Sequence, residues 1–256
     1  MFGWMKGRRR RAFVAAEFPD LWMGFLGANV PQYVRLGSLE QAKLRDDLRI
    51  FMAEKYWEGA GGLELSDEMK VTISAQACLL ILCLDNDYYP NVQSVIVYPE
   101  GYRAPRRDHR PGGVVDERME DRLGEAHGIG PVVLSWRSAR EGVLNPHDGA
   151  NVVFHEFAHK LDFVDGAADG VPRLYGKDQY DRWAEVMSAE FDKLVRASSL
   201  ERETLLDPYG ATNPAEFFAV CTECFFERPS ELRQEHPRLY ETLREYFRQD
   251  PAEWAD

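Results

Sequence analysis

The stretch FHEFAHKLD, residues 154–162, constrains the fold more than any other part of this chain. It places His155 and His159 four residues apart, with Glu156 directly after the first histidine. On an α-helix, residues four apart project from one face with Cβ atoms about 5–6 Å apart, so both imidazoles can bind one metal ion. Glu156 is rotated by about 100° from His155 and lies beside the ion, where it can take a proton from water. The stretch predicts a helix that binds a metal ion for the hydrolysis of peptide bonds. The alternative is an ordinary amphipathic helix in which the same pattern occurs by chance.

A catalytic zinc ion needs a third protein ligand and keeps a fourth position for water. HKLDFVDGAAD, the stretch that begins at His159, contains no further histidine, so a carboxylate on a later helix is the remaining common solution. YGATNPAEFF offers Glu216 in the first turn of a helix, with Asn213 and Pro214 as N-cap and first residue. Its neighbours are apolar, and a buried carboxylate needs a partner such as a metal ion. A first-turn glutamate that is favoured only by the helix dipole is the alternative.

Two further carboxylates are candidates for supporting roles around the ion. Glu223 lies seven residues after Glu216, on the same helix face about 10 Å further along. It is expected either to orient a ligand histidine or to pair with a basic surface residue. Asp162 returns to the ligand face of the motif helix and is a candidate hydrogen-bond partner for a ligand or for a nearby backbone group. The pair Cys221 and Cys224 is interpreted as core packing, because no second cysteine pair stands at zinc-ribbon spacing.

Periodicity and turn signals predict an α+β fold in a single domain, residues 1–256, with a flexible basic tail over about residues 1–20. The segments VQSVIVYP and GPVVLSW are expected to be strands of a small mixed sheet whose edge lies beside the active-site helix, joined by an exposed hairpin or flap. The motif helix is expected to run to about Phe163, with Asn145 or Asp148 as its cap. Other helices are expected over residues 39–57, 67–84 with Ser66 as N-cap, 179–195, 214–226 and 230–247.

The composition limits the classes of partner that this chain is expected to bind. With 43 acidic and 31 basic residues, the formal net charge of -12 repels phosphate backbones, so direct nucleic-acid binding is not expected. No apolar run approaches the roughly 18 residues of a membrane span, and no membrane partner is expected. Four cysteines are too few for a secreted disulfide scaffold, which favours a cytoplasmic location. The arginines at 8–11 are interpreted as a solvated basic N-terminus rather than a twin-arginine export signal.

HEFAHKLDFVDG together with YGATNPAEFFAVCTECFFERP resembles the Mlc titration factor A family of zinc peptidases, over nearly the whole chain. FLGANVPQY and VIVYPEGY resemble segments of that family as well. The site is also similar to that of the anthrax lethal factor catalytic domain, in which an AEFFAE glutamate completes the zinc site. The resemblance implies a zincin-like metallopeptidase with one zinc ion per chain, held by His155, His159 and Glu216. It also implies Glu156 as general base and a peptide as substrate.

The resemblance further implies a role for Tyr209, seven residues before Glu216. Its hydroxyl is suited to donate a hydrogen bond to the oxyanion that develops when water attacks a carbonyl. The segment DPYG by itself indicates only a turn with a half-exposed tyrosine. The family is associated with capture of the Mlc repressor of glucose phosphotransferase genes, so an Mlc-like repressor is an expected protein partner. A regulatory binding protein with secondary peptidase activity is therefore one alternative. A scaffold that has lost the chemistry is another.

Overall fold

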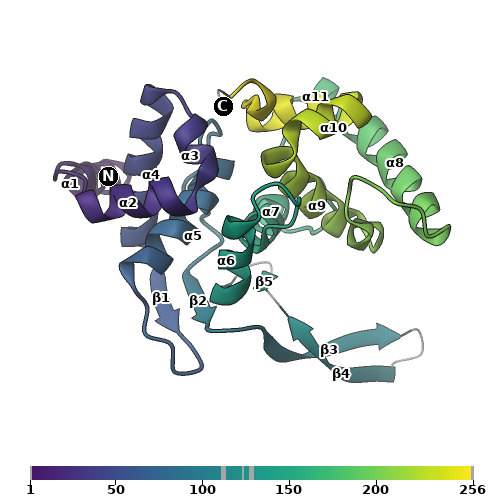
Figure 1. Ribbon diagram of the computed structural model, residues 1–256, viewed down its shortest axis with the longest axis horizontal. Helices are drawn as coiled ribbons and strands as arrows, with labels where there is room; N and C mark the ends of the chain where they lie inside the picture. Colours follow the sequence, from purple (N-terminus) through teal and green to yellow (C-terminus); the bar gives the residue numbers. More distant parts are fainter. Residues whose placement is uncertain (1, 111–113, 123, 127–129, 255–256) are drawn as a thin grey trace.

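The computed structural model describes residues 2–110, 114–122, 124–126 and 130–254 (Figure 1). The first half of the chain contains the helices α1 (Phe2–Val14), α2 (Asp20–Asn29), α3 (Pro31–Arg35), α4 (Ser38–Glu54) and α5 (Asp67–Leu80), and the strands β1 (Tyr56–Gly59), β2 (Ser94–Tyr98), β3 (Tyr102–Arg110), β4 (Val114–Arg122), β5 (Gly124–Ala126) and β6 (Val132–Ser135). The second half is helical, with α6 (Trp136–Leu144), α7 (Val152–Asp162), η1 (Phe163–Asp165), α8 (Lys177–Ser199), η2 (Pro208–Ala211), α9 (Pro214–Glu227), α10 (Pro229–Glu235), α11 (Pro237–Phe247) and η3 (Pro251–Glu253).

The main sheet is small and mixed, as the sequence predicts. Its strand order is β1-β2-β6-β5, in which β1, β2 and β6 are parallel and β5 runs antiparallel to β6 at the edge. β5 and β6 both lie against α7, which carries the motif. The strands β3 and β4 form a separate antiparallel hairpin, which reaches away from the sheet in Figure 1. The α+β prediction, with an edge strand beside the active-site helix, is confirmed.

The motif helix lies between the two halves of the molecule. α7 packs against α5 on one side and against α9 on another. Its Phe157 ring contacts Tyr89 and Phe51, with ring centroids 4.8 and 5.7 Å apart. Phe154 packs on Phe226 of α9 at 5.4 Å. These aromatic contacts bury α7 on two sides and hold it at a fixed distance from α9.

Several element boundaries differ from the predictions. The helix expected over residues 39–57 ends at Glu54, because the next residues pair with β2 as β1. The single helix expected over residues 230–247 is two helices, α10 and α11, because Pro237 has no N–H to continue the first one. The Ser66 cap is confirmed, with its side chain accepting a hydrogen bond from Met69 N. Helices α1 to α3 had no counterpart among the predictions.

The basic residues 8–11 lie in the helix α1. Arg10 is held by Glu54 of α4, with Nε 2.8 Å from Oε1 and Nη2 2.6 Å from Oε2. Its guanidinium also lies 4.5 Å from the Tyr88 ring. α1 is thereby fixed to the body of the molecule. Among the described residues, no helix combines the length and the apolar character that crossing a bilayer requires.

Candidate active site

The motif helix α7 begins at a buried asparagine. Asn151 Oδ1 accepts hydrogen bonds from the N–H groups of Val153 and Phe154, both at 3.1 Å. This satisfies donors that the first turn of a helix leaves unpaired. The cap is therefore Asn151, and the prediction of Asn145 or Asp148 was wrong. The segment NPHDGAN offers three good capping residues, and only the last lies directly before the apolar run.

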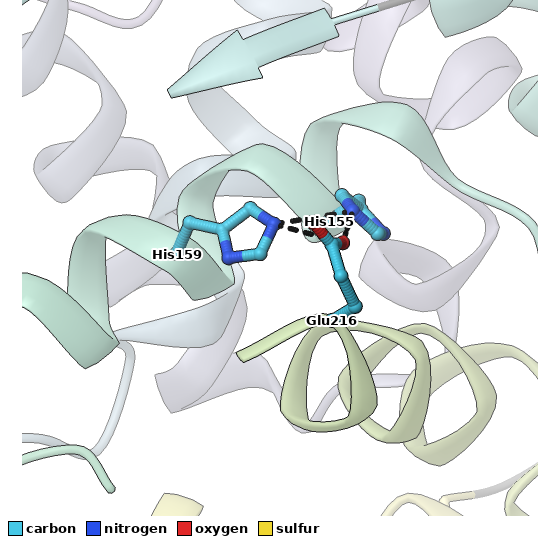
Figure 2. Close-up of side chains that lie close together, drawn as sticks. All are labelled: His155, His159 and Glu216. Carbon is cyan, nitrogen blue, oxygen red and sulfur yellow. Dashed lines mark hydrogen bonds and ion pairs between the residues drawn. The ribbon is translucent and has the colours of Figure 1, made fainter. Parts of the chain in front are cut away.

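His155 and His159 project from the face of α7 that is turned toward α9. Figure 2 shows both imidazoles directed at Glu216, which reaches them from the first turn of α9. That turn is set by Asn213, whose Oδ1 accepts a hydrogen bond of 3.0 Å from Glu216 N. The expected N-cap at Asn213 is confirmed, and Pro214 follows it as the first helical residue. Two helix starts thus bring three side chains to one point.

The three donor atoms form a compact triangle. His155 Nε2 lies 3.0 Å from Glu216 Oε2 and 3.2 Å from His159 Nε2, and His159 Nε2 lies 3.3 Å from Glu216 Oε2. A tetrahedral ion with ligands at about 2.0–2.1 Å separates those ligands by about 3.3–3.4 Å. Among the described residues, this is the group of His, Cys, Asp and Glu side chains with the spacing of a metal site. Two nitrogens and one carboxylate oxygen fit a divalent transition-metal ion.

A second carboxylate of α9 determines which nitrogen of His155 faces the triangle. Glu223 Oε1 lies 2.6 Å from His155 Nδ1, and Glu223 Oε2 accepts a 2.6 Å hydrogen bond from Asn151 N. Because a carboxylate only accepts, Nδ1 of His155 donates its proton to Glu223, and Nε2 is the ring nitrogen that faces Glu216 and His159. Of the two alternatives for Glu223, the structure shows contact with the ligand histidine. Partners of this kind fix a histidine for metal binding.

Burial and neighbouring charged groups shift the pKa values of the site residues in opposite directions. Burial raises the pKa of Glu156 to about 7, although His155 and His159 work in the other direction. Burial also raises the pKa of the Glu216 carboxyl, but its hydrogen bonds with both histidines outweigh this and leave the pKa well below the usual range. Burial disfavours the charged form of His155, yet Glu223 and Glu216 hold its pKa well above the ordinary value. A buried carboxyl with a pKa near 7 is suited to general base catalysis.

Asp162 contacts a backbone group rather than a ligand. Its Oδ2 accepts a 3.0 Å hydrogen bond from Gly170 N, and burial raises its pKa to about 6. The carbonyl of Gly170 accepts from Trp183 Nε1 at 3.0 Å. Gly170 has φ +77°, and a Cβ at this residue would lie 2.3 Å from Pro214 O. The loop after α7 is thus pressed against the first residue of the helix that carries Glu216.

Tyr209 lies at the exposed side of the site. It belongs to the short helix η2, where Asp207 Oδ1 accepts a 2.8 Å hydrogen bond from Tyr209 N. Its ring centroid is 6.0 Å from that of His155, and the residue is 55% exposed. The turn and the half-exposed ring that DPYG indicates are both present. The same ring is also a neighbour of the candidate ligand His155.

Glu227 has no counterpart among the site residues predicted from the sequence. This buried carboxyl accepts a hydrogen bond from Asn151 Nδ2 at 3.0 Å through Oε1, and burial raises its pKa to about 8. It therefore supports the residue that caps the motif helix. The signal was present in the spacing, because residues 216, 223 and 227 lie within one arc of about 40° around a helix. Cys221 and Cys224, on the same helix, are buried free thiols.

Comparisons with known proteins agree with this geometry. The sequence model of the glucose-regulated metallo-peptidase M90 family matches residues 4–248. An uncharacterized protein of Synechocystis is 37% identical over 97% of this chain and 90% of its own length. The Mlc titration factor A of Klebsiella pneumoniae is 31% identical over 87% of this chain and 84% of its own, and that of Salmonella arizonae is 29% identical over 91% and 92%.

The family match spans nearly the full chain and includes both helices that carry the candidate ligands. The resemblance in the HEFAH and AEFF segments is therefore part of a relationship that extends over the whole fold. A three-residue His, His and Glu metal site lies at its centre. On these grounds the chain belongs to the glucose-regulated metallo-peptidase family M90.

Proposed function

We propose that this chain is a zinc-dependent peptidase with one zinc ion, held by His155, His159 and Glu216. The observation that carries the proposal is the donor triangle with sides of 3.0, 3.2 and 3.3 Å, which suits a small tetrahedral ion. Zinc is favoured over other metals because two imidazoles and a carboxylate, with an open fourth position, are a common catalytic zinc ligand set. When bound, zinc acidifies water and polarises a carbonyl group.

The side chains around the triangle divide the reaction between them. Glu156 takes a proton from the attacking water and later returns it to the leaving amine, and its raised pKa suits both transfers. Tyr209 donates its hydroxyl proton in a hydrogen bond to the oxyanion, from the exposed side of the site. Glu223 holds the ring of His155, and Asp162 holds the loop that borders α9.

The substrate in this proposal is an extended peptide. Strand β5 is the last strand of the main sheet on the side of α7, so in the part of the chain that the structure describes its outer edge pairs with no other strand. An extended peptide adds to such an edge through backbone hydrogen bonds, without regard to its sequence. This arrangement would bring a scissile peptide bond alongside α7.

Metal content and turnover of the purified protein test the proposal together. We expect about one zinc per chain, cleavage of a mixture of unstructured peptides, and loss of both properties in the double variant His155→Ala/His159→Ala. His147→Ala is the matched control, because His147 is exposed and lies outside the donor triangle. Free and N-acetylated forms of each peptide separate trimming of ends from internal cleavage. Unchanged cleavage by the double variant would exclude this site as the catalyst.

We also propose that the chain binds a repressor of the Mlc type. The support is its 29–31% identity with proteins named Mlc titration factor A, over most of both chains. Binding by a surface apart from the metal site makes this compatible with peptidase activity, and the regulatory role is then a second function. The four free cysteines of the described chain are consistent with the reducing cytoplasm in which a repressor acts.

Titration of the purified chain with a purified Mlc-type repressor, by calorimetry, tests this second proposal. We expect a complex that forms equally well with the parent and with His155→Ala/His159→Ala. A complex that the double variant fails to form would place the repressor at the metal site instead. No complex with either protein would refute the proposal and would leave the peptidase function untouched.

A further inference from the structure

The N-terminal helix α1 has an outward face of unusual composition. At 100° per residue, the side chains on this face fall within one arc of about 160°. Trp4 is 66% exposed and Met5 is 60% exposed. The remaining long side chains on the arc are three exposed arginines, Arg8, Arg9 and Arg11. No acidic residue occurs anywhere in α1.

The opposite face of α1 is attached to the protein. Arg10 pairs with Glu54 at 2.6 Å and with Asp87 at 2.7 Å, and Lys6 pairs with the same Asp87 at 2.5 Å. Lys6 and Arg10 are four residues apart, so both lie on one side of the helix. The two attachments use the basic residues of the inner face and leave the outer arc directed away from the body. The orientation of this arc is thus determined by the fold.

The outer arc contrasts with the rest of the chain. The formal net charge is -12, whereas α1 contributes five basic side chains and no acid. Arg8 lies 5.9 Å from the ring of Trp4, so the cationic and aromatic groups form one continuous surface. At an anionic membrane surface, arginines meet the charged headgroups, and a neighbouring tryptophan ring can lie in the interface beneath them.

We propose that the outer face of α1, formed by Trp4, Met5, Arg8, Arg9 and Arg11, docks on the surface of a lipid bilayer that contains anionic headgroups. The arginines bind lipid phosphates, and the Trp4 ring and the Met5 side chain enter the interface between headgroups and acyl chains. Each arginine near an anionic surface strengthens partitioning about fivefold, and three together about a hundredfold. This replaces the expectation that the chain has no membrane partner, and it does not depend on the proposed peptidase function.

A lipid surface fits the two apolar side chains better than a nucleic acid does. The phosphate backbone of a nucleic acid would bind the arginines but not the two apolar side chains. The strongly negative remainder of the chain would also repel a long polyanion that wraps around it. A flat bilayer meets only the face that is turned toward it. Repulsion from acidic groups further away is screened over about 8 Å at physiological salt. An anionic bilayer can therefore bind both the arginines and the apolar side chains of this face.

Co-sedimentation of the full-length protein with vesicles tests the proposal. One set of vesicles is an equal mixture of phosphatidylglycerol and phosphatidylcholine, and the other is phosphatidylcholine alone. We expect partitioning to the mixed vesicles only, with a decrease as salt increases. The triple variant Arg8→Gln/Arg9→Gln/Arg11→Gln should bind about a hundredfold more weakly, and Trp4→Ala should also bind more weakly.

A matched triple variant controls for loss of charge as such. Arg182→Gln/Arg238→Gln/Arg244→Gln removes three arginines that are likewise exposed, on α8 and α11, and should bind the vesicles like the parent. Thermal unfolding and zinc content of the α1 variants should match those of the parent. The proposal is overturned by equal binding to both kinds of vesicle, by absence of binding, or by full binding of the α1 triple variant. It is also overturned if Trp4→Ala binds normally and double-stranded DNA displaces the vesicles, since a general polyanion site would then explain the result.

Discussion

Glu223 Oε1 lies 2.6 Å from His155 Nδ1, and the other oxygen of the same carboxylate accepts a hydrogen bond from Asn151 N. One side chain of α9 therefore fixes both the ring of a candidate ligand and the first turn of the helix that carries it. Since Glu216 is on α9 too, two carboxylates of this helix contact the same imidazole, one at each ring nitrogen.

Glu223→Gln tests this link. The amide keeps the volume of the side chain but replaces one accepting oxygen with a donor, which faces either the N–H of Asn151 or the Nδ1 proton of His155. We expect zinc affinity to fall by about 10–100-fold, measured by competition with a coloured chelator. Glu185→Gln, which changes an exposed carboxylate on α8, should leave the affinity unchanged. Unchanged affinity in Glu223→Gln would mean that His155 needs no support.

Tyr209→Phe tests the role of the hydroxyl at the exposed side of the site. The change should lower kcat by about 10–100-fold, toward the smaller end of such effects because water reaches a residue that is 55% exposed. KM and zinc content should change little, because the hydroxyl acts only when negative charge develops on the substrate. Steady-state kinetics on one peptide measure this. Tyr56→Phe, at an exposed tyrosine of β1, is the control, and an equal kcat in both variants would exclude the role.

Gly170→Ala tests the contact between the loop after α7 and the start of α9. Its added Cβ would lie 2.3 Å from Pro214 O, so either the loop or the first turn of α9 has to move. Gly166→Ala is the matched control, because Gly166 also has a positive φ, +97°, but nothing within 4 Å of the added atom. We expect Gly170→Ala to lose about 1–3 kcal/mol more unfolding free energy than Gly166→Ala. Zinc affinity should fall in Gly170→Ala alone, and equal losses in both variants would refute the contact.

Glu227→Gln tests the buried carboxyl beneath the α7 cap. Burial raises the pKa of Glu227 from 4.5 to about 8, so between these values the folded protein holds a proton that the unfolded chain has released. The unfolding free energy of the parent should therefore fall as pH rises through this window and level off above it. The glutamine has no such proton and still accepts from Asn151. Its stability relative to the parent should rise by at most about 1.4 kcal/mol per pH unit. Urea unfolding of both metal-free proteins across the window measures this, and a pH-independent difference would contradict it.

The predictable parts of the site are those that depend on spacing within one helix. His155, Glu156 and His159 follow from a five-residue pattern, and the Asn213 cap placed Glu216 in a first turn. Contacts between helices were not accessible in this way. The choice between two roles for Glu223, and the contact of Gly170 with Pro214, depend on how α7, α9 and the loop pack.

The fold shows the same division between local and long-range information. The strands β2 and β6 were predicted from their β-branched residues, whereas β1 was assigned to the preceding helix. A four-residue strand such as Tyr56–Gly59 is stable only through its partner β2, and sequence periodicity does not record that partner. The break between α10 and α11 was available from Pro237, whose effect outweighs the helical pattern around it.

Glu156→Gln tests the proposed mechanism at its centre, because it removes the proposed base without removing a proposed ligand. Zinc content and turnover are measured on the same preparation of the purified variant. We expect about one zinc per chain, as in the parent, and a kcat lower by about 10²–10⁴. A variant that holds zinc and cleaves peptides at the rate of the parent would show that Glu156 is not the base, and the proposed mechanism would be wrong.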